Sequence, residues 1–231
     1  MNENKYRRGD KMSDLICDNH SLLMVMSRFG LSLGFGDKTV EAVCAAGGVD
    51  CDTFLAVANF IGEREFSYDE NGSALAIKPL MEYLKSAHNY FLDFCLPMLR
   101  RKLIEAIDFN ADKDIVLLIL QFYDNYVEEV RRHMEYENKS VFTYVDALLR
   151  GERQPGYRIK VFSEKHNQID VKLRDLKNII IKYYPGGDGY LLNAVLFDIV
   201  NCEQDLASHC QVEDYLFVPA VAALERRLGN E

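Results

Sequence analysis

Four long stretches with helical periodicity follow one another from residue 77 onward, and they constrain the fold more than any other feature of the sequence. In each of them apolar residues recur at the spacing of one helix face. The breaks between them are short and polar or rich in Gly and Pro. The stretches are 77–107, 115–149, 159–184 and 190–228, and the breaks are 108–114, 150–156 and 185–189. Helices of this kind joined by short loops predict an all-α fold, an up-down-up-down four-helix bundle.

The histidines are distributed over this bundle in a regular way. The chain has five, and each of the four long stretches contains one of them: His88, His133, His166 and His209. Two of these histidines are followed four residues later by a glutamate, as His133-x-x-x-Glu137 and His209-x-x-x-Glu213. This spacing places both side chains of a pair on one helix face. Each half of the predicted bundle thus has a helix with a lone histidine followed by a helix with a His/Glu pair.

Four imidazoles and two carboxylates in a bundle core predict a site for two metal ions. Imidazole nitrogen suits iron, zinc and manganese, and a carboxylate can bridge two ions and lower their repulsion. Two divalent ions would keep net positive charge, so an oxo, hydroxo or water-derived ligand is expected as well, with an open position for a small molecule. The alternative is a structural bundle with zinc or with no metal, in which these pairs only stabilise their helices.

The order of these residues resembles the hemerythrin-like di-iron bundle of the repair-of-iron-centres family. The local sequences are similar too, in Ser86-Ala87-His88-Asn89-Tyr90, in Ser163-Glu164-Lys165-His166 and in the Leu216-Phe217-Val218-Pro219 that follows the last pair. The resemblance implies a non-haem centre of two iron ions, oxo- or hydroxo-bridged. It also implies the ligands, with Glu137 and Glu213 as bridges and the four histidines, His88, His133, His166 and His209, as terminal ligands.

The resemblance extends to a small helical domain before the bundle. In the family this domain has a glycine-flanked Cys-Cys turn, then a Lys, then a helix with a further Cys. The segment from Gly30 to Lys38, followed by Cys44, has this layout, but Gly34 and Phe35 stand in the places of the paired cysteines. A role of those two thiols in sulfur redox chemistry or iron handling therefore does not carry over to this chain.

The sequence predicts four parts. Residues 1–11 form a flexible tail, 12–61 the small helical domain, 62–76 a polar, turn-rich linker, and 77–231 the bundle. Within the small domain we expect three short helices, a first one over 12–29, a second one over 40–46 capped by Thr39, and a third one capped by Asp50 or Asp52. In the bundle, Pro97 and Pro219 predict a kink or a local break.

Charge and cysteine usage narrow the partners and the compartment. A formal net charge of −9 gives no reason to expect binding to nucleic acid or to anionic membranes. No apolar run is long enough to span a membrane, and the first residues do not resemble a secretion signal. The six cysteines contain no C-x-x-C and predict reduced thiols in a cytoplasmic protein. Cys17, His20, Cys44 and Cys51 could be drawn as a zinc site, but their spacing is not that of a known finger.

The resemblance implies a function in protecting or repairing iron-sulfur clusters after oxidative or nitrosative stress. The expected partners are damaged iron-sulfur proteins and small ligands such as oxygen, nitric oxide or peroxide, and a homodimer is left open. The alternative is a sensor or binding module that uses the same di-iron site without turnover. Whether the protein is an enzyme is also left open.

Overall fold

The computed structural model describes residues 5–62, 75–107, 113–152, 156–165, 169–186 and 189–229. Its elements are α-helices and short π-helices, and the described residues contain no strand beyond one isolated bridge between Lys11 and Thr39. The predicted all-α fold is therefore confirmed. The chain divides into two compact units, one of Met1–Ala87, Val141–Lys165 and His209–Glu231, the other of His88–Ser140 and His166–Ser208.

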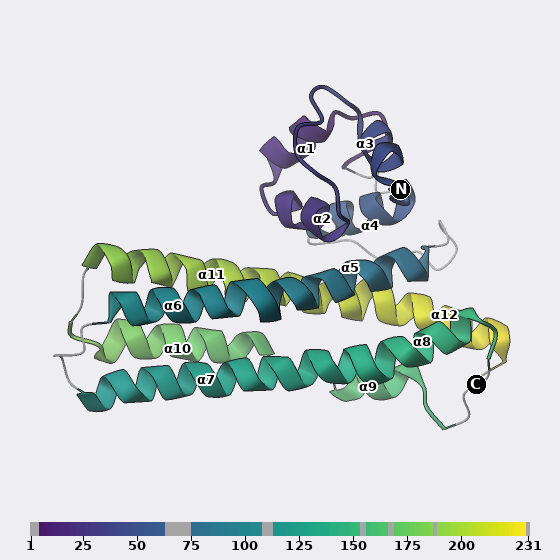
Figure 1. Ribbon diagram of the computed structural model, residues 1–231. Helices are drawn as coiled ribbons and strands as arrows, with labels where there is room; N and C mark the ends of the chain where they lie inside the picture. The colour runs from purple at the N-terminus through teal and green to yellow at the C-terminus, as the bar shows by residue number, and fades with distance from the viewer. Residues whose placement is uncertain are drawn as a thin grey trace. The chain divides into compact units, whose positions relative to one another are not determined.

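The first unit begins with four short helices, which Figure 1 labels α1 to α4. They are α1 (Met12–Asp18), α2 (Leu22–Arg28), α3 (Val40–Gly47) and α4 (Cys51–Gly62). Thr39 caps α3 as predicted, because its hydroxyl oxygen accepts a hydrogen bond from the Ala42 N–H at 3.3 Å. Of the two candidates for the cap of α4, Asp50 has this role, since its carboxylate accepts from the N–H of Thr53 at 2.8 Å.

The prediction of one helix over residues 12–29 was wrong. The structure has two helices there, α1 and α2, separated at Asn19, whose backbone is extended (φ −142°, ψ 103°). The Asn19 side-chain oxygen accepts a hydrogen bond from the N–H of Ser21 at 3.0 Å, which makes a local turn that competes with helix continuation. Both helices still bury apolar side chains, so the apolar pattern itself does not reveal the break.

The rest of the first unit consists of one part of each long helical stretch. It contains nearly all of α5 (Ile77–Asn89), all of α8 (Phe142–Leu149), α9 (Ile159–Lys165) and α12 (Val218–Leu228), and a π-helix, η3 (Glu213–Phe217). The α12 helix packs against α8, α9 and η3. Between α8 and η3 the rings of Phe142 and Phe217 meet edge to face, with centroids 5.7 Å apart. Phe29 packs on Tyr83 of α5 at 4.9 Å, which extends one apolar core from the short helices to this unit's bundle helices.

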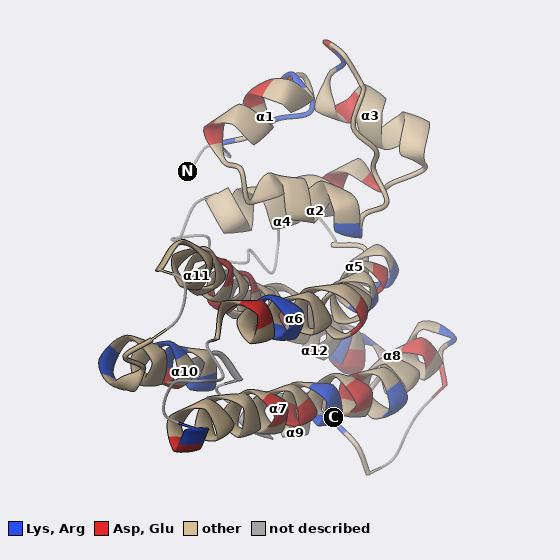
Figure 2. Ribbon diagram, turned by 60° about the vertical axis from the view of Figure 1, so that its left-hand side comes forward, with Lys and Arg blue, Asp and Glu red and all other residues tan. Residues whose placement is uncertain are grey.

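The second unit consists mainly of four helices, together with the π-helices η1 (Tyr90–Cys95) and η2 (Glu137–Val141). The helices are α6 (Leu96–Ala106), α7 (Lys113–Tyr136), α10 (Ile169–Tyr183) and α11 (Gly189–Val212). Acidic and basic residues are interspersed along α7 and α10 (Figure 2).

Four ion pairs form a closed ring around these helices and identify which helices are neighbours. They join α6 to α7, α7 to α10, α10 to α11 and α11 to α6. The pairs are Arg100–Asp124, Lys172–Glu129, Lys177–Glu203 and Lys102–Asp198. Exposed pairs of this kind contribute little stability individually, so the apolar core between the helices must supply most of it.

The boundaries of the long helices agree with the sequence prediction to within a few residues. The helical stretches run over 77–106, 113–149 and 189–228, and the third stretch consists of α9 and α10. Most of the predicted linker, residues 63–74, lies outside the described residues, so the division into domains remains a prediction. No helix among the described residues combines the length and the apolar character that a membrane span needs.

Candidate metal centre

His88 and Glu137 face each other in the second unit. His88 lies near the end of α5, and Glu137 is the first residue of the π-helix η2. The Nε2 atom of His88 is 3.1 Å from Oε2 of Glu137, and both side chains are completely buried. A buried carboxylate costs free energy unless positive charge or hydrogen bonds compensate it. The burial of Glu137 is therefore unfavourable unless a neighbouring group compensates its charge.

The other oxygen of Glu137 faces a second histidine. Its Oε1 atom lies 2.7 Å from Nε2 of His133, which precedes it by one helical turn. The side chain of His133 is 17% exposed, so it reaches the carboxylate from the edge of the buried region. Glu137 thus directs one oxygen to each of two imidazoles, as a carboxylate that bridges two ions would do.

His209 and Glu213 repeat the pairing in the first unit. His209 lies near the end of α11, and Glu213 begins the π-helix η3. The distance from Nε2 of His209 to Oε1 of Glu213 is 3.2 Å, and each side chain is 1% exposed. The predicted His-x-x-x-Glu pairs are thus both formed.

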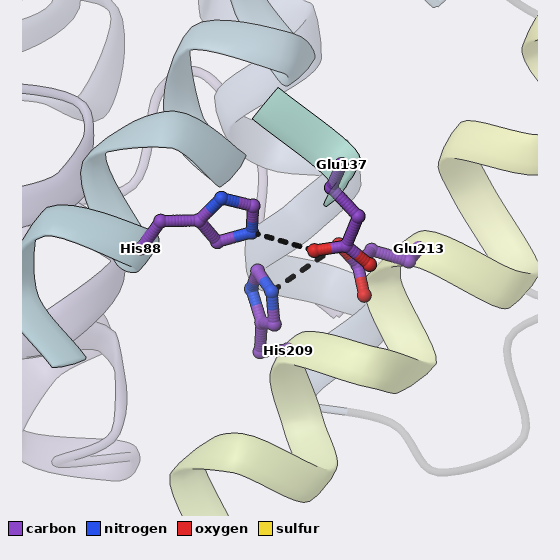
Figure 3. Close-up of side chains that lie close together, drawn as sticks. All are labelled: His88, Glu137, His209 and Glu213. Carbon is purple, nitrogen blue, oxygen red and sulfur yellow. Dashed lines mark ion pairs between the residues drawn. The ribbon is translucent and has the colours of Figure 1, made fainter. Parts of the chain in front are cut away.

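Four of the six predicted residues make a compact group of possible ligands. One donor atom from each of His88, Glu137, His209 and Glu213 lies within 4.8 Å of all the others. Figure 3 shows both imidazoles directed at the two carboxylates. His133 adjoins this group through Glu137. His166 lies outside the described residues, so its predicted place in the site remains a prediction.

Three π-helical segments adjoin the site residues. The segments η2 and η3 begin at the two glutamates, and η1 begins two residues after His88. A π turn bonds each N–H to the carbonyl five residues back and is found mostly as a short insertion in an α-helix, often at a functional site. Two of the segments have a sequence cause, because Pro97 and Pro219 lie two residues after η1 and η3 and cannot donate an α-helical hydrogen bond.

A contact that the sequence did not predict fixes the ring of His88. Its Nδ1 atom lies 3.0 Å from Oδ1 of Asn138, the residue after Glu137. An amide oxygen can only accept, so the Nδ1–H donates and the Nε2 lone pair is left for the site. The only sequence signal for this role is that Asn138 directly follows a predicted ligand.

A family model for the hemerythrin HHE cation-binding domain matches residues 80–221, more than half of the 231 residues. The chain belongs to the hemerythrin family. No curated protein matches the sequence. The matched region contains all six predicted ligands, and it begins inside α5 and ends inside α12.

The residues of this hemerythrin-like site fit a bound metal. Two carboxylates that are at most 1% exposed lie within 4.8 Å of each other and would repel strongly in a buried, low-dielectric place. Imidazole nitrogens can donate lone pairs to a cation, and the two carboxylates need positive charge to compensate them. A cation bound between them would supply the missing charge, and nitrogen with carboxylate oxygen is a ligand set that iron accepts.

The alternative zinc site in the short helices has no such support. Among the described residues, the group that could hold an ion consists of the four bundle residues alone, and it includes neither Cys17, His20, Cys44 nor Cys51. All six cysteines are free thiols. The metal-binding geometry of this hemerythrin-like chain is thus found in the bundle.

Proposed function

We propose that the bundle binds two iron ions, with Glu137 and Glu213 as bridging ligands and His88, His133, His166 and His209 as terminal ones. The observation that carries this proposal is the position of Glu137, whose two oxygens face two different histidines at 3.1 and 2.7 Å. A carboxylate that bound a single ion would not need to direct its two oxygens at two different histidines. The duplicated pair at His209 and Glu213 supports a second, equivalent half of the site.

A bound pair of iron ions would supply one-electron redox chemistry and an open position for oxygen, nitric oxide or peroxide. The residues of the chain provide the environment for this chemistry. The burial of Glu137 and Glu213 excludes bulk water, which strengthens every charge interaction in the site. Asn138 holds His88 in the tautomer that presents Nε2.

Metal analysis of anaerobically purified protein tests the centre. We expect close to two iron ions per chain, and a clear loss of iron in the single variants His88→Ala, Glu137→Gln and Glu213→Gln. His20→Ala is the matched control, because the fifth histidine is exposed and lies in the turn between α1 and α2. Iron content well under two per chain that does not respond to the bundle variants would refute the proposal.

We propose further that the protein acts in the cytoplasm to protect or repair iron-sulfur clusters damaged by oxidative or nitrosative stress. This proposal rests on the resemblance of the six-residue constellation and of the Gly30 to Lys38 segment to the repair-of-iron-centres family. The absence of the Cys-Cys pair at Gly34 and Phe35 limits it to chemistry that the bundle can carry alone. An iron-sulfur enzyme inactivated with nitric oxide provides the test, in which the reduced protein should restore activity beyond an equal amount of free ferrous iron.

A sensor is the second candidate, and one contact favours it. Tyr215 belongs to η3, the π-helix that begins with Glu213, and its ring lies 6.0 Å from the ring of Phe60 in α4. A change of geometry at Glu213 could therefore reach the short helices through two aromatic rings. Recovery no better than that with free iron, together with a change in tryptic cleavage of the short helices when the reduced protein meets nitric oxide, would favour sensing over repair.

A further inference from the structure

Two buried thiols meet where α3 turns into α4. Cys44 lies in α3 and is fully buried, and Cys51 is the first residue of α4 and is 9% exposed. Each thiol lies close enough to the other for a side-chain interaction that shifts its pKa. This pair is independent of the metal centre, because none of the six predicted ligands belongs to α3 or α4.

The connection between the helices brings the two thiols together. The α3 helix is terminated by its cap residue Gly48, whose φ of 67° is in the left-handed region that favours glycine. The N–H of Val49 donates to the carbonyl of Cys44 at 2.9 Å, and Asp50 then caps α4 through Thr53. The chain reverses within these few residues, so α4 begins beside α3 and the two helices are in contact.

Two neighbouring thiols can be joined by a disulfide. The bond requires sulfur atoms about 2.05 Å apart and Cα atoms about 5.5–6 Å apart. Neighbouring thiols at the two ends of a tight turn can approach each other largely by side-chain rotation. The helices are held in place meanwhile by Arg8, whose guanidinium pairs with Glu41 of α3 at 2.9 Å and with Asp52 of α4 at 2.7 Å.

The surroundings distinguish the two thiols chemically. Burial raises the pKa of Cys44 to about 12, so this thiol keeps its proton near neutral pH. Burial also raises the pKa of Cys51, but the hydrogen bond from Cys44 and the charge of Arg8 oppose the rise. The other charged groups that act on the pair are the carboxylates of Glu41, Asp50 and Asp52, which favour the protonated forms. Cys51, which is also at a helix N-terminus, is therefore the better source of thiolate.

We propose that Cys44 and Cys51 form a redox pair that a hydroperoxide converts into an intramolecular disulfide. The Cys51 thiolate attacks the O–O bond and becomes a sulfenic acid, and hydroxide or an alcohol leaves. The Cys44 sulfur then attacks the Cys51 sulfur, a disulfide forms, and the sulfenic oxygen leaves as water with the proton of the Cys44 thiol. The peroxide takes up two electrons and the two thiols supply them. A dithiol reductant returns the pair to its reduced form.

The segment from Thr39 to Arg64 makes the test direct, because it contains both thiols and trypsin has no Lys or Arg to cleave between them. The full chain is treated with hydrogen peroxide, alkylated in denaturant and digested. We expect the 39–64 peptide to be two hydrogen atoms lighter, unalkylated at both cysteines, and restored by dithiothreitol. The rate should rise with pH by up to about tenfold per unit in the neutral range, since the thiolate is the reacting form.

The variants separate the two roles. Cys51→Ser should abolish both the sulfenic acid and the disulfide, whereas Cys44→Ala should leave a sulfenic acid at Cys51 that dimedone traps. Cys17→Ser is the control, because Cys17 is exposed in α1, and it should leave the cross-link intact. The peptide mass of the wild-type chain decides the question even if Cys44→Ala does not fold. A folded protein that loses the thiol of Cys17 to peroxide while Cys44 and Cys51 stay alkylatable would overturn the proposal, as would bonds between chains.

Discussion

The Nδ1 atom of His88 lies 3.0 Å from the amide oxygen of Asn138, while its Nε2 atom faces Glu137 at 3.1 Å. One ring is thus held from both sides by consecutive residues of the same π-helix. A ligand imidazole usually donates its second N–H in this way, and the donor contact fixes both the tautomer and the orientation of the ring. Asn138 is therefore a positioning residue of the proposed centre.

Replacing Asn138 should weaken metal binding without removing a ligand. We expect Asn138→Ala to lower iron affinity by about 10–100-fold, the usual effect of losing such a partner. At saturating iron the number of ions bound should be unchanged. Competition with a chelator of known affinity measures the effect. The exposed Asn201→Ala in α11 is the control, and equal affinities for the two variants would show that the Asn138 contact has no positioning role.

Glu213→Gln should have opposite effects with and without metal. In metal-free protein the change removes one of two buried neighbouring carboxylates, and the free energy of unfolding should rise by about 1–3 kcal/mol. With iron present the wild type should be the more stable protein, because it retains the full ligand set. Urea unfolding with and without chelator measures both values. The exposed Glu105→Gln provides the reference, and a Gln variant that is less stable in both states would contradict the prediction.

Glu225 should be important for stability although it lies outside the site. Its Oε1 atom accepts from the hydroxyl of Tyr144 at 2.5 Å and from the N–H of Ile159, the first residue of α9, at 2.8 Å. Glu225→Ala would leave two buried donors without this acceptor, so we expect a loss of about 2–4 kcal/mol in the free energy of unfolding. Glu225→Gln keeps an acceptor oxygen and should lose less, and equal losses in both variants would argue against this explanation.

Alkaline pH should destabilise the fold through buried tyrosines. Burial raises the pKa of Tyr123, and burial together with the hydrogen bond to Glu225 raises the pKa of Tyr144. The native protein therefore holds these protons where the unfolded chain, with a tyrosine pKa of about 10, has lost them. Their contribution to stability is complete below about pH 10 and is lost as the pH rises above it, by at most about 1.4 kcal/mol per pH unit for each group.

Urea midpoints measured between about pH 9 and 11 test this dependence. Tyr144→Phe and Tyr123→Phe should each flatten the alkaline decline. Tyr190→Phe, at a position that is 90% exposed, should leave it unchanged. A decline as steep in Tyr144→Phe as in the wild type would show that other groups cause it.

The sequence predicted the bundle because apolar periodicity directly reports which helix face is buried. The spacing of the two His/Glu pairs is also readable from the sequence, because four residues have the same meaning in any regular helix, and the structure has His133 beside Glu137 and His209 beside Glu213. The sequence did not predict the break at Asn19, where a side chain replaces a backbone hydrogen bond without disturbing the apolar pattern.

The π-helices show which structural features can be recognised from neighbouring residues in the sequence and which cannot. Pro97 and Pro219 indicated a disturbance, and the structure has a π-helix directly before the helix that contains each proline. The segment from Glu137 to Val141 contains no proline and has none close behind it, so the sequence gives no sign of its π turn or of the contact that Asn138 makes there. Contacts between distant helices, such as that of Asn138 with His88, depend on packing that a single helix does not encode.

The near-complete burial of His88, Glu137, His209 and Glu213 also has a consequence for time scales. An ion enclosed by these side chains would leave no faster than the surrounding helices open, so its lifetime in the protein would follow local unfolding rather than equilibrium affinity. Direct delivery of iron to a damaged cluster would then require a partner that opens the bundle. Reactions of small diffusible molecules at the enclosed site would not need that step.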